Sequence, residues 1–174
     1  SAISHKIAYV TEDRKGNGLI LSQTITQNTV SARPEKVSKH GIYNFDECRR
    51  VAQDSSKEMR TKCATVDEAV GNLSGGNMQK VLLGKWLFAD PDILILDEPT
   101  RGIDVGAKYE IYCIINRMVA EGKSVILISS EMPEVLGMSD RIYVMNEGRM
   151  IAEMDAKDEK KKKIMSCIIS SENK

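Results

Sequence analysis

Two short apolar runs, separated by an amphipathic segment, form the clearest pattern in this chain. Residues 93–96 and 124–128 are almost entirely apolar, which is typical of strands that are buried on both faces of a sheet. Between them, apolar residues recur at helical spacing from Ala107 to Val119, and Gly122 follows as an end signal. This order of strand, helix and strand predicts a βαβ unit and therefore a parallel sheet.

Two more elements precede this unit. Residues 7–10 predict a strand that enters a polar turn at 11–17. An apolar face that runs from Met78 to Trp86 predicts a helix that ends near Ala89. The sheet is therefore expected to have helices packed against it, which places the chain in the α/β class.

The remaining segments give the domain organisation. Asn44 is suited to cap a helix over 45–62, because Glu47 follows three residues later. Residues 142–145 and 150–152 flank Asn-Glu-Gly, which predicts a hairpin. We therefore divide the chain into a core strand and turn (1–18), a small, mainly helical subdomain (19–72), the main α/β core (73–155) and a polar C-terminal tail (156–174).

Composition excludes several classes of protein. The 174 residues carry 25 basic and 25 acidic side chains, so the chain lacks the basic excess of non-specific nucleic-acid binders. The four cysteines form no C-x-x-C pair, which favours free thiols in a reducing cytosol over a zinc site. No apolar run is long enough to span a bilayer, and residues 1–10 do not predict a signal peptide. The basic run at 160–163 is interpreted as a solvated helix face or chain end, with acidic-lipid contact as the alternative.

The acidic pair Asp97-Glu98 follows the first apolar run directly. Open α/β sheets bind ligands at the carboxyl ends of their strands, so both side chains are expected at a ligand site. Asp97 is suited to Mg²⁺, which prefers a few carboxylates together with phosphate oxygens. Glu98 is suited to orienting or deprotonating a water that attacks a phosphoryl group. The alternative for the pair alone is two acids that cap a loop.

A Leu-Ser-Gly-Gly run begins at Leu73, just before a predicted helix. Ser74 can cap that helix, while Gly75 and Gly76 allow backbone N–H groups to approach an anion closely. The helix N-terminus adds a partial positive charge, so the segment is suited to phosphate. Taken alone, the run is equally typical of an ordinary turn before a helix.

A glycine loop with a lysine, of the pattern G-x-x-x-x-G-K-[ST], is absent from the sequence. Gly122-Lys123-Ser124 fits its end, but Arg117 stands where the first glycine is required. The same segment precedes a strand, whereas a phosphate-binding P-loop follows a strand and opens a helix.

Taken together, these motifs resemble the nucleotide-binding domain of ABC-type ATPases, a P-loop NTPase fold of which this chain carries a part. The likeness rests on Leu-Ser-Gly-Gly at 73–76, Ile-Leu-Ile-Leu-Asp-Glu-Pro at 93–99, Asp104 and Ser-Ser-Glu at 129–131. A narrower resemblance is to the second half of the tandem ATPase subunits of bacterial simple-sugar importers, of the ribose, galactose, xylose and multiple-sugar type. It is carried by Thr-Glu-Asp-Arg-Lys at 11–15, Asn-Met-Gln-Lys at 77–80, Thr-Arg-Gly-Ile-Asp at 100–104 and Ser-Ser-Glu-Met-Pro-Glu-Val at 129–135. The resemblance covers about residues 6–154.

The resemblance implies a role for each matching position. The signature that closes on the γ-phosphate of a partner domain's nucleotide would consist of Ser74, Gly75, Gly76 and Gln79. Asp97 and Glu98 would be the Walker B acids, which serve this domain's own ATP and Mg²⁺, and Asp104 would lie in the loop that crosses the domain interface.

The same resemblance implies partners and a location. Residues 19–72 would face a transmembrane permease, and a second ABC domain would share the parent chain. The parent would lie in the cytoplasm, on the inner face of the cell membrane, and would not bind nucleic acid.

Two positions depart from the family pattern. Glu12 or its neighbour stands where the family has glutamine, and Ser130 stands where it has histidine. A hydroxyl cannot supply the charge of an imidazolium to a γ-phosphate. Both changes predict impaired hydrolysis at this domain's own site, without affecting what the signature does for a partner.

Three readings therefore stay open. The chain is interpreted first as a fragment of a sugar-import ATPase, inactive alone, and second as a non-catalytic half that completes a composite ATP site. The third is a DNA-maintenance ATPase, which the balanced charge and the absence of long heptads or zinc-type cysteine pairs disfavour.

Overall fold

The computed structural model describes residues 1–155 and residue 164. The predicted tail at 156–174, including the basic run at 160–163, therefore lies outside the described residues except for Ile164. The chain divides into two compact units, residues 1–128 and residues 129–174. Each unit is described by itself.

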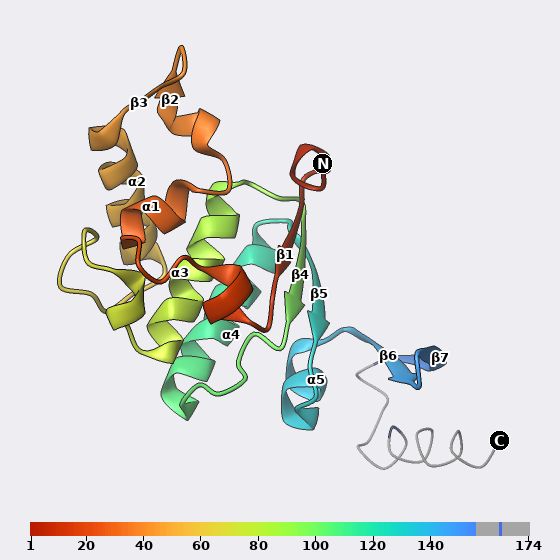
Figure 1. The fold of residues 1–174 in the computed structure, drawn as a ribbon. Coiled ribbons are helices and arrows are strands. Elements are labelled where there is room, and N and C mark those ends of the chain that lie inside the picture. The colour runs from red at the N-terminus through yellow and green to blue at the C-terminus, as the bar shows by residue number, and fades with distance from the viewer. Residues whose placement is uncertain (156–163, 165–174) are drawn as a thin grey trace. The chain divides into compact units, whose positions relative to one another are not determined.

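The first unit contains a three-stranded parallel sheet in the order β1-β4-β5 (Figure 1). Its strands are β1 (Ile7–Val10), β4 (Ile93–Asp97) and β5 (Ser124–Ile128). In the register of the sheet, Tyr9 lies beside Ile95 and Ile95 lies beside Ile126. The predicted strands and their parallel arrangement are confirmed.

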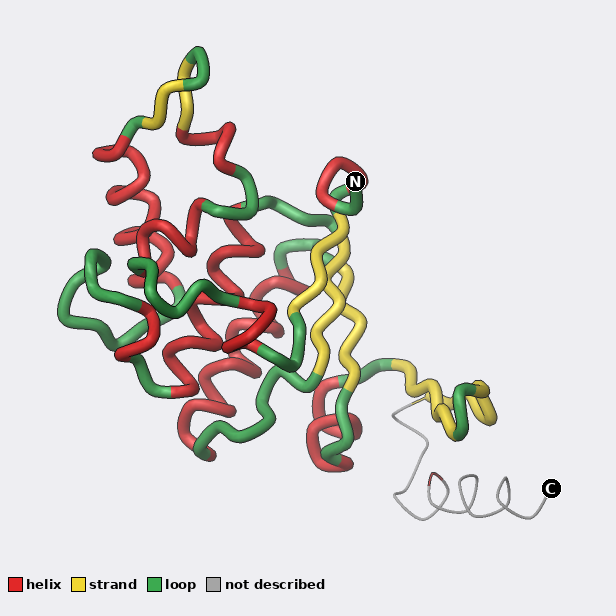
Figure 2. The backbone as a smooth tube through the Cα atoms, in the orientation of Figure 1, coloured by secondary structure: helices red, strands yellow, loops and turns green. Residues whose placement is uncertain are grey.

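Two long helices cover one face of this sheet. Helix α3 (Gly75–Phe88) packs against β1, and α4 (Val105–Ala120) packs against β5. Figures 1 and 2 show both helices on the same side of the strands. The strand residues that face them are the core of the unit, and they include Ala8, Val10, Leu94 and Leu96, all buried.

The opposite face of the sheet is open, so the expectation that the strands are buried on both faces is wrong. Side chains that alternate with the core positions keep much of their surface: 47% for Tyr9, 52% for Ile126 and 46% for Ile128. The physical reason is that α3 and α4, the long helices that contact the sheet, share the other face. The apolar run alone could not distinguish one covered face from two.

A smaller group of elements packs on the outer side of α3. It comprises α1 (Ile25–Val30), α2 (Phe45–Glu58) and a short hairpin of β2 (Ser38–Lys39) and β3 (Ile42–Tyr43). The first unit also contains four short helices. One precedes β1, η1 (Ile3–His5), and three lie in the connections before and within the smaller group and after it: η2 (Arg14–Gly18), η3 (Pro34–Val37) and η4 (Val70–Asn72).

The predicted helix after Asn44 is confirmed, although it ends at Glu58, earlier than residue 62. The side chain of Asn44 accepts a hydrogen bond from the backbone N–H of Glu47, as expected of a cap. The separation of 19–72 as a subdomain of its own stays a prediction.

The second unit begins with α5 (Met132–Met138) and continues as an antiparallel hairpin of β6 (Arg141–Asn146) and β7 (Arg149–Asp155). Glu147 and Gly148 form the turn with φ of 47° and 75°, which favours glycine and tolerates few other residues. The predicted hairpin is confirmed. Its own small core comprises Ile142, Val144, Met154 and Ile164, with side chains of α5 packed against it.

No helix among residues 1–155 is both long enough and apolar enough to cross a membrane.

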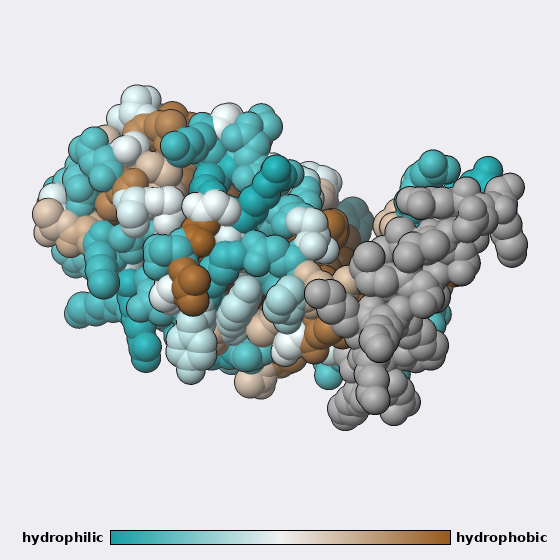
Figure 3. Space-filling model, turned by 90° about the horizontal axis from the view of Figure 1, so that it is seen from below, coloured by the Kyte–Doolittle hydropathy of each residue, from teal (hydrophilic) through white to brown (hydrophobic). Residues whose placement is uncertain are grey.

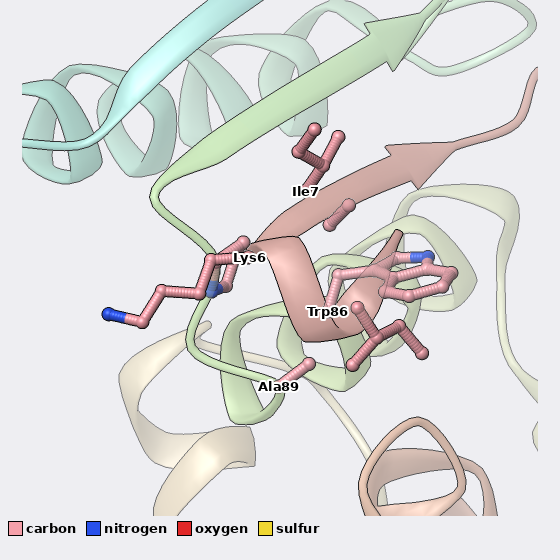
Figure 4. A pocket seen from close by; sticks show the side chains of 7 residues that line it. Lys6, Ile7, Trp86 and Ala89 are labelled. Carbon is pink, nitrogen blue, oxygen red and sulfur yellow. The ribbon is translucent and has the colours of Figure 1, made fainter. Parts of the chain in front are cut away.

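A crevice near the N-terminus is lined by Ile7, Trp86 and Ala89, while the side chain of Lys6 points away from it (Figure 4). The crevice has no room for a water molecule, so we do not treat it as a site.

Candidate functional site

The N-terminus of α3 is built by the Leu-Ser-Gly-Gly segment. Ser74 is the N-cap, and its Oγ accepts hydrogen bonds from Asn77 through the backbone N–H (3.4 Å) and Nδ2 (3.0 Å). The predicted capping role of Ser74 is therefore confirmed. The first N–H groups of the helix have no partner within the helix, which leaves them suited to an anion.

Gly76 brings a second helix close to the first. A Cβ at this position would lie 2.7 Å from the Cβ of Ala107 on α4, a distance that real Cβ atoms do not adopt. Asp104 caps α4, with its Oδ1 accepting from the backbone N–H of Ala107 at 3.0 Å. The two N-termini and their partial positive charges therefore lie side by side.

A cavity of about 240 Å³ opens between these two N-termini. It is lined by Lys62, Ser74, Gly76, Asn77, Lys80, Asp104, Gly106, Ala107 and Glu110. Figure 3 views the molecule from below, toward the carboxyl ends of the strands, and hydrophilic residues cover most of the surface described there. The location and lining of the cavity suit a polar ligand better than an apolar one.

Three of the predicted signature residues belong to this region, and Gln79 does not. Ser74 and Gly76 line the cavity, and Gly75 is the first residue of α3 between them. Gln79 is buried on another side of the helix, where its Oε1 accepts a hydrogen bond from Arg14 at 3.5 Å. Its Nε2 has no partner in the part of the chain that the structure describes.

Six lining residues were absent from the predicted site, and four of them have polar or charged side chains: Lys62, Asn77, Lys80 and Glu110. One signal could have pointed to two of them. Lys80 follows the Ser74 cap by six residues, and Glu110 follows the Asp104 cap by the same interval. Because the helices start side by side, equal spacing places these opposite charges near each other.

Asp97 and Glu98 lie at the carboxyl end of β4, as predicted, and both are partly buried. The hydroxyl of Tyr9 on β1 donates a hydrogen bond to Asp97 Oδ2 at 2.6 Å. This bond, and the negative charge of Asp97, raise the pKa of Tyr9 above its ordinary value. No local sequence pattern indicates this contact, because 88 positions separate the two residues.

Glu98 has a backbone conformation that is rare for a residue with a side chain. Its φ is 46°, in the left-handed region, where L residues other than glycine are strained by about 1 kcal/mol or more. Its N–H donates to the carbonyl of Ile128 at 2.9 Å, and its carbonyl accepts from the N–H of Arg101 at 3.2 Å. These contacts hold the turn after β4 in place.

The turn after β1 is tied to the same region. Glu12 forms an ion pair with Arg101, and Nη2 of Arg14 donates to the carbonyl of Arg101 at 2.6 Å. Glu12 therefore lies next to the loop between Glu98 and Asp104. Ser130 belongs to the second unit, just before α5, and its place in a shared site stays a prediction.

The donor set fits a magnesium ion that arrives with phosphate, and not a stand-alone ion. In the described part of the chain, no three His, Cys, Asp or Glu side chains are grouped so that they could hold a metal. Mg²⁺ commonly takes one or two carboxylates and completes its shell with phosphate oxygens and water. Asp97 meets that need, because Tyr9 occupies one carboxylate oxygen and leaves the other.

Comparison with known proteins decides the family. The family model described as ABC transporter matches residues 1–101, which is more than half of the 174 residues. The chain belongs to the ABC transporter family. The predicted ABC-type α/β core is therefore confirmed.

Several curated relatives extend this assignment. The L-arabinose transport ATP-binding protein AraG of Geobacillus stearothermophilus is 53% identical over 166 residues, which cover 94% of this chain and 32% of the relative. The xylose import ATP-binding protein XylG of Geobacillus kaustophilus is 51% identical, with 95% and 33% covered. The ribose import ATP-binding protein RbsA of Rhodococcus jostii is 45% identical, with 99% and 34% covered. The chain thus spans about a third of the length of these relatives.

Solved structures support the same fold. The ABC transporter component cbiO1 of Clostridium perfringens superposes with a TM-score of 0.71 at 28% identity, covering 89% of this chain and 59% of that one. A nucleotide-free ATP-binding cassette from an ABC transporter gives a TM-score of 0.74 at 20% identity, with 97% and 66% covered. The latter likeness concerns the fold alone.

Proposed function

We propose that this chain is part of the ATP-binding subunit of an importer of simple sugars, and that it couples ATP binding and hydrolysis to transport. The observation that carries the proposal is the identity of 51–53% to arabinose and xylose import subunits over more than nine-tenths of the chain. Since the chain covers only a third of those relatives, transport and ATP turnover are properties of a longer protein.

The signature segment acts on a nucleotide held by a second ABC domain in this proposal. Ser74, Gly75 and Gly76 close on its γ-phosphate, with the Ser74 hydroxyl and the free N–H groups of α3 as donors. The proposal is supported by the two helix N-termini at the cavity, because both carry partial positive charge toward an approaching phosphate. Asp104, which caps the second helix, lies at the same interface.

The acidic pair serves this domain's own nucleotide. Asp97 would hold the Mg²⁺ that accompanies ATP, which would supply positive charge to the phosphates. Glu98 orients the attacking water and accepts its proton. Because the chain has no glycine-lysine loop, this site is incomplete within these residues, and the isolated chain is expected to be inactive.

Two residues lower the hydrolytic capacity of that site in our proposal. A carboxylate at Glu12 accepts hydrogen bonds but cannot donate them, unlike the amide of glutamine. In this chain it is also engaged by Arg101. Ser130 replaces a histidine and cannot carry positive charge at neutral pH. Hydrolysis by the parent would then depend mainly on the other ABC domain.

The partners follow from the same assignment. Residues 19–72 face transmembrane permease subunits, and the protein lies at the cytoplasmic face of the membrane. The hairpin and the start of α2 expose Ile42 and Phe45, which gives this region apolar surface for protein contact. We assign no role in nucleic-acid binding, in keeping with the net charge of zero.

Turnover measurements test the proposal at two levels. The isolated chain should hydrolyse ATP no faster than background, and robust turnover by clean protein would overturn the assignment. In the intact subunit, Ser74→Arg should lower turnover more than Glu98→Gln does. Equal or reversed effects would argue against a site in which the signature makes the larger contribution.

Salt-dependent binding to duplex DNA would distinguish a DNA-maintenance ATPase from a sugar importer. A DNA-maintenance ATPase would bind duplex DNA with an affinity that falls steeply as salt rises. We expect no such binding at physiological ionic strength, and its detection would favour that alternative over sugar import.

A further inference from the structure

Lys80 is a buried charge that the proposed function does not use. Its side chain keeps only 2% of its accessible surface, yet it lines the cavity beside Ser74 and Gly76. Its Nζ donates to the carbonyl of Arg60 at 2.9 Å. A buried ammonium requires a partner of opposite charge, because an uncompensated charge is costly to remove from water.

Glu110 is that partner. Its carboxylate forms an ion pair with Lys80 across the gap between α3 and α4, and it also lines the cavity. The hydrogen bond from Lys80, followed by the charges of Lys80, Lys62 and Arg60, lowers the pKa of Glu110. Glu110 is therefore ionised at neutral pH and cancels the charge of Lys80.

Lys62 adds a second ammonium, which is exposed where that of Lys80 is buried. Its backbone N–H donates to Asn77 Oδ1 at 2.9 Å, and Asn77 Nδ2 donates to Ser74 Oγ. The backbone of Lys62 is thus fixed to the start of α3, while its side chain is exposed at the cavity. Within residues 1–155 its ammonium makes no ion pair.

The four ionised side chains of the cavity sum to zero. Lys62 and Lys80 are positive, Asp104 and Glu110 are negative, and Asp104 is already engaged as the cap of α4. Glu110 is therefore the acid whose removal would turn the cavity into a cationic site. An anion that approaches Ser74 competes with Glu110 for the ammonium of Lys80.

The start of α3 (Ser74, Gly75 and Gly76) and the cavity beside it form what we call the signature surface. We propose that Glu110 is an internal counter-ion that sets the phosphate affinity of this surface. Lys62 and Lys80 are the cations that recognise the phosphate. An entering phosphate group takes the place of the Glu110 carboxylate beside Lys80, while Lys62 approaches it from the rim. The ion pair keeps the surface weakly binding until a nucleotide is presented to it. This inference rests on the proposed function of the signature surface and names the residues that tune it.

Tripolyphosphate tests the inference on the full 174-residue chain, since it presents the phosphates of a nucleotide without a base. Binding is followed in the ¹⁵N-labelled protein through the backbone amides of Gly75 and Gly76. We expect Glu110→Gln to tighten binding at least about 5-fold and Lys62→Ala to weaken it at least about 3-fold. Lys57→Ala is the matched control, because Lys57 is exposed on α2 and does not line the cavity; it should leave the affinity unchanged.

A second variant guards against loss of folding. Glu110→Gln leaves Lys80 without its partner and could destabilise the chain, whereas Lys80→Met combined with Glu110→Gln removes both charges together. The double variant should bind tripolyphosphate less tightly than Glu110→Gln does, and no more tightly than the unsubstituted chain. Lys62→Ala changes an exposed side chain and should fold normally. Its affinity for tripolyphosphate can therefore be measured even if a Glu110 variant does not fold.

The outcomes distinguish the two proposals. If the amides of Gly75 and Gly76 respond in no variant, the phosphate contact in the proposed function is overturned. If they respond equally in the unsubstituted chain, in Lys62→Ala and in Glu110→Gln, the phosphate contact stands and the counter-ion role is overturned. Weaker binding by Glu110→Gln would likewise overturn the counter-ion role.

Discussion

At the scale of single residues, the candidate site depends on close approaches that few side chains permit. Gly76 allows α3 and α4 to begin next to each other. Glu98, directly after β4, has a left-handed backbone conformation with a φ of 46°. A strained backbone conformation persists where surrounding contacts hold it in place. For Glu98, these contacts are its backbone hydrogen bonds with Ile128 and Arg101.

Gly76→Ala should therefore destabilise the chain by about 1–3 kcal/mol, because the new methyl would overlap that of Ala107. Gly75→Ala is the matched control. Its Cβ would meet only the carbonyl oxygen of Gly102 at 3.7 Å, an ordinary contact, so the change should stay under about 1 kcal/mol. Urea denaturation of both variants measures the difference, and equal costs would contradict the close approach of the helices.

Asp97→Asn should lower the pKa of Tyr9 toward its ordinary value of about 10. The raised pKa means that the Tyr9–Asp97 hydrogen bond stabilises the fold below that value, and that the contribution is lost as pH rises through the raised pKa. The measurement is an NMR titration of ¹³C-labelled tyrosine rings, with Tyr9→Phe to assign the signal. Glu98→Gln should leave the titration of Tyr9 largely unchanged; an unshifted Tyr9 in Asp97→Asn would contradict the contact.

Residues differ in how far the sequence predicted their roles. Ser74 could be placed because it lies immediately before a helix with a clear pattern, and capping is a local interaction. The capping role of Asp104 was not predicted, although it is equally local. Tyr9 and Asp97 are separated by 88 positions, and Lys80 and Glu110 by 30. Such contacts depend on strand register and helix packing, which no local pattern determines.

At the scale of elements, α3 is held firmly at both ends. Its first turn is capped by Ser74. At its last turn, Lys36 Nζ donates to the carbonyl of Phe88 at 2.7 Å and Arg33 Nη1 to that of Ala89 at 3.4 Å. Cations at a helix C-terminus also complement its dipole. Displacement of the segment around η3 would therefore be transmitted to the signature helix.

The segment that leads into α1 is organised by one buried side chain, Asn28. Its Nδ2 donates to the carbonyls of Ile20 and Thr24, each at 3.0 Å, and its Oδ1 accepts from the N–H of Ile20 at 2.8 Å. Asn28→Ala would leave the N–H of Ile20 without this acceptor and would remove one of the two donors to each carbonyl, since Gln23 N–H and Asn28 N–H still reach them. We expect a loss of about 2–4 kcal/mol in the free energy of unfolding, measured by urea denaturation.

Gln27→Ala provides the control on the same helix. Gln27 is exposed and contributes a capping-box hydrogen bond to the N–H of Thr24, so its truncation should cost about 1 kcal/mol or less. Asn28→Asp adds a second comparison, because it keeps the acceptor for Ile20 and replaces the donor with a charged oxygen. It should also be destabilising; a neutral effect would show that the amide donor contributes little.

Element boundaries were predicted well where periodicity and end signals agreed. The strands at β1, β4 and β5 and the helices α2, α3 and α4 all occur as expected. The short hairpin of β2 and β3 was not predicted, because each strand has only two residues and no alternating pattern can develop.

At the scale of the whole molecule, the sheet of the first unit has one buried and one open face. Leu94→Ala on the buried face should cost about 2–5 kcal/mol, because it creates a cavity beneath α3 and α4. Ile126→Ala on the open face should cost under about 1 kcal/mol, since half of that side chain is already exposed. Chemical denaturation of the two variants tests the difference, and comparable costs would mean that the open face is covered in solution.

The error about this face shows the limit of the sequence. The apolar runs correctly predicted strands of a parallel sheet, but they carry no information about how many layers cover them. That depends on which helices the rest of the chain supplies, and the chain covers about a third of the length of its relatives.

The burial of Lys80 has a practical consequence. Amine-acylating reagents attack the neutral, accessible form of a lysine, so the side chain sealed between α3 and α4 should remain unlabelled while the exposed Lys62 reacts. Mass spectrometry of the digested chain would read the two sites separately. Label on Lys80 would then mark molecules in which Glu110 has left the ammonium, so this amine reports how often the ion pair opens toward the cavity.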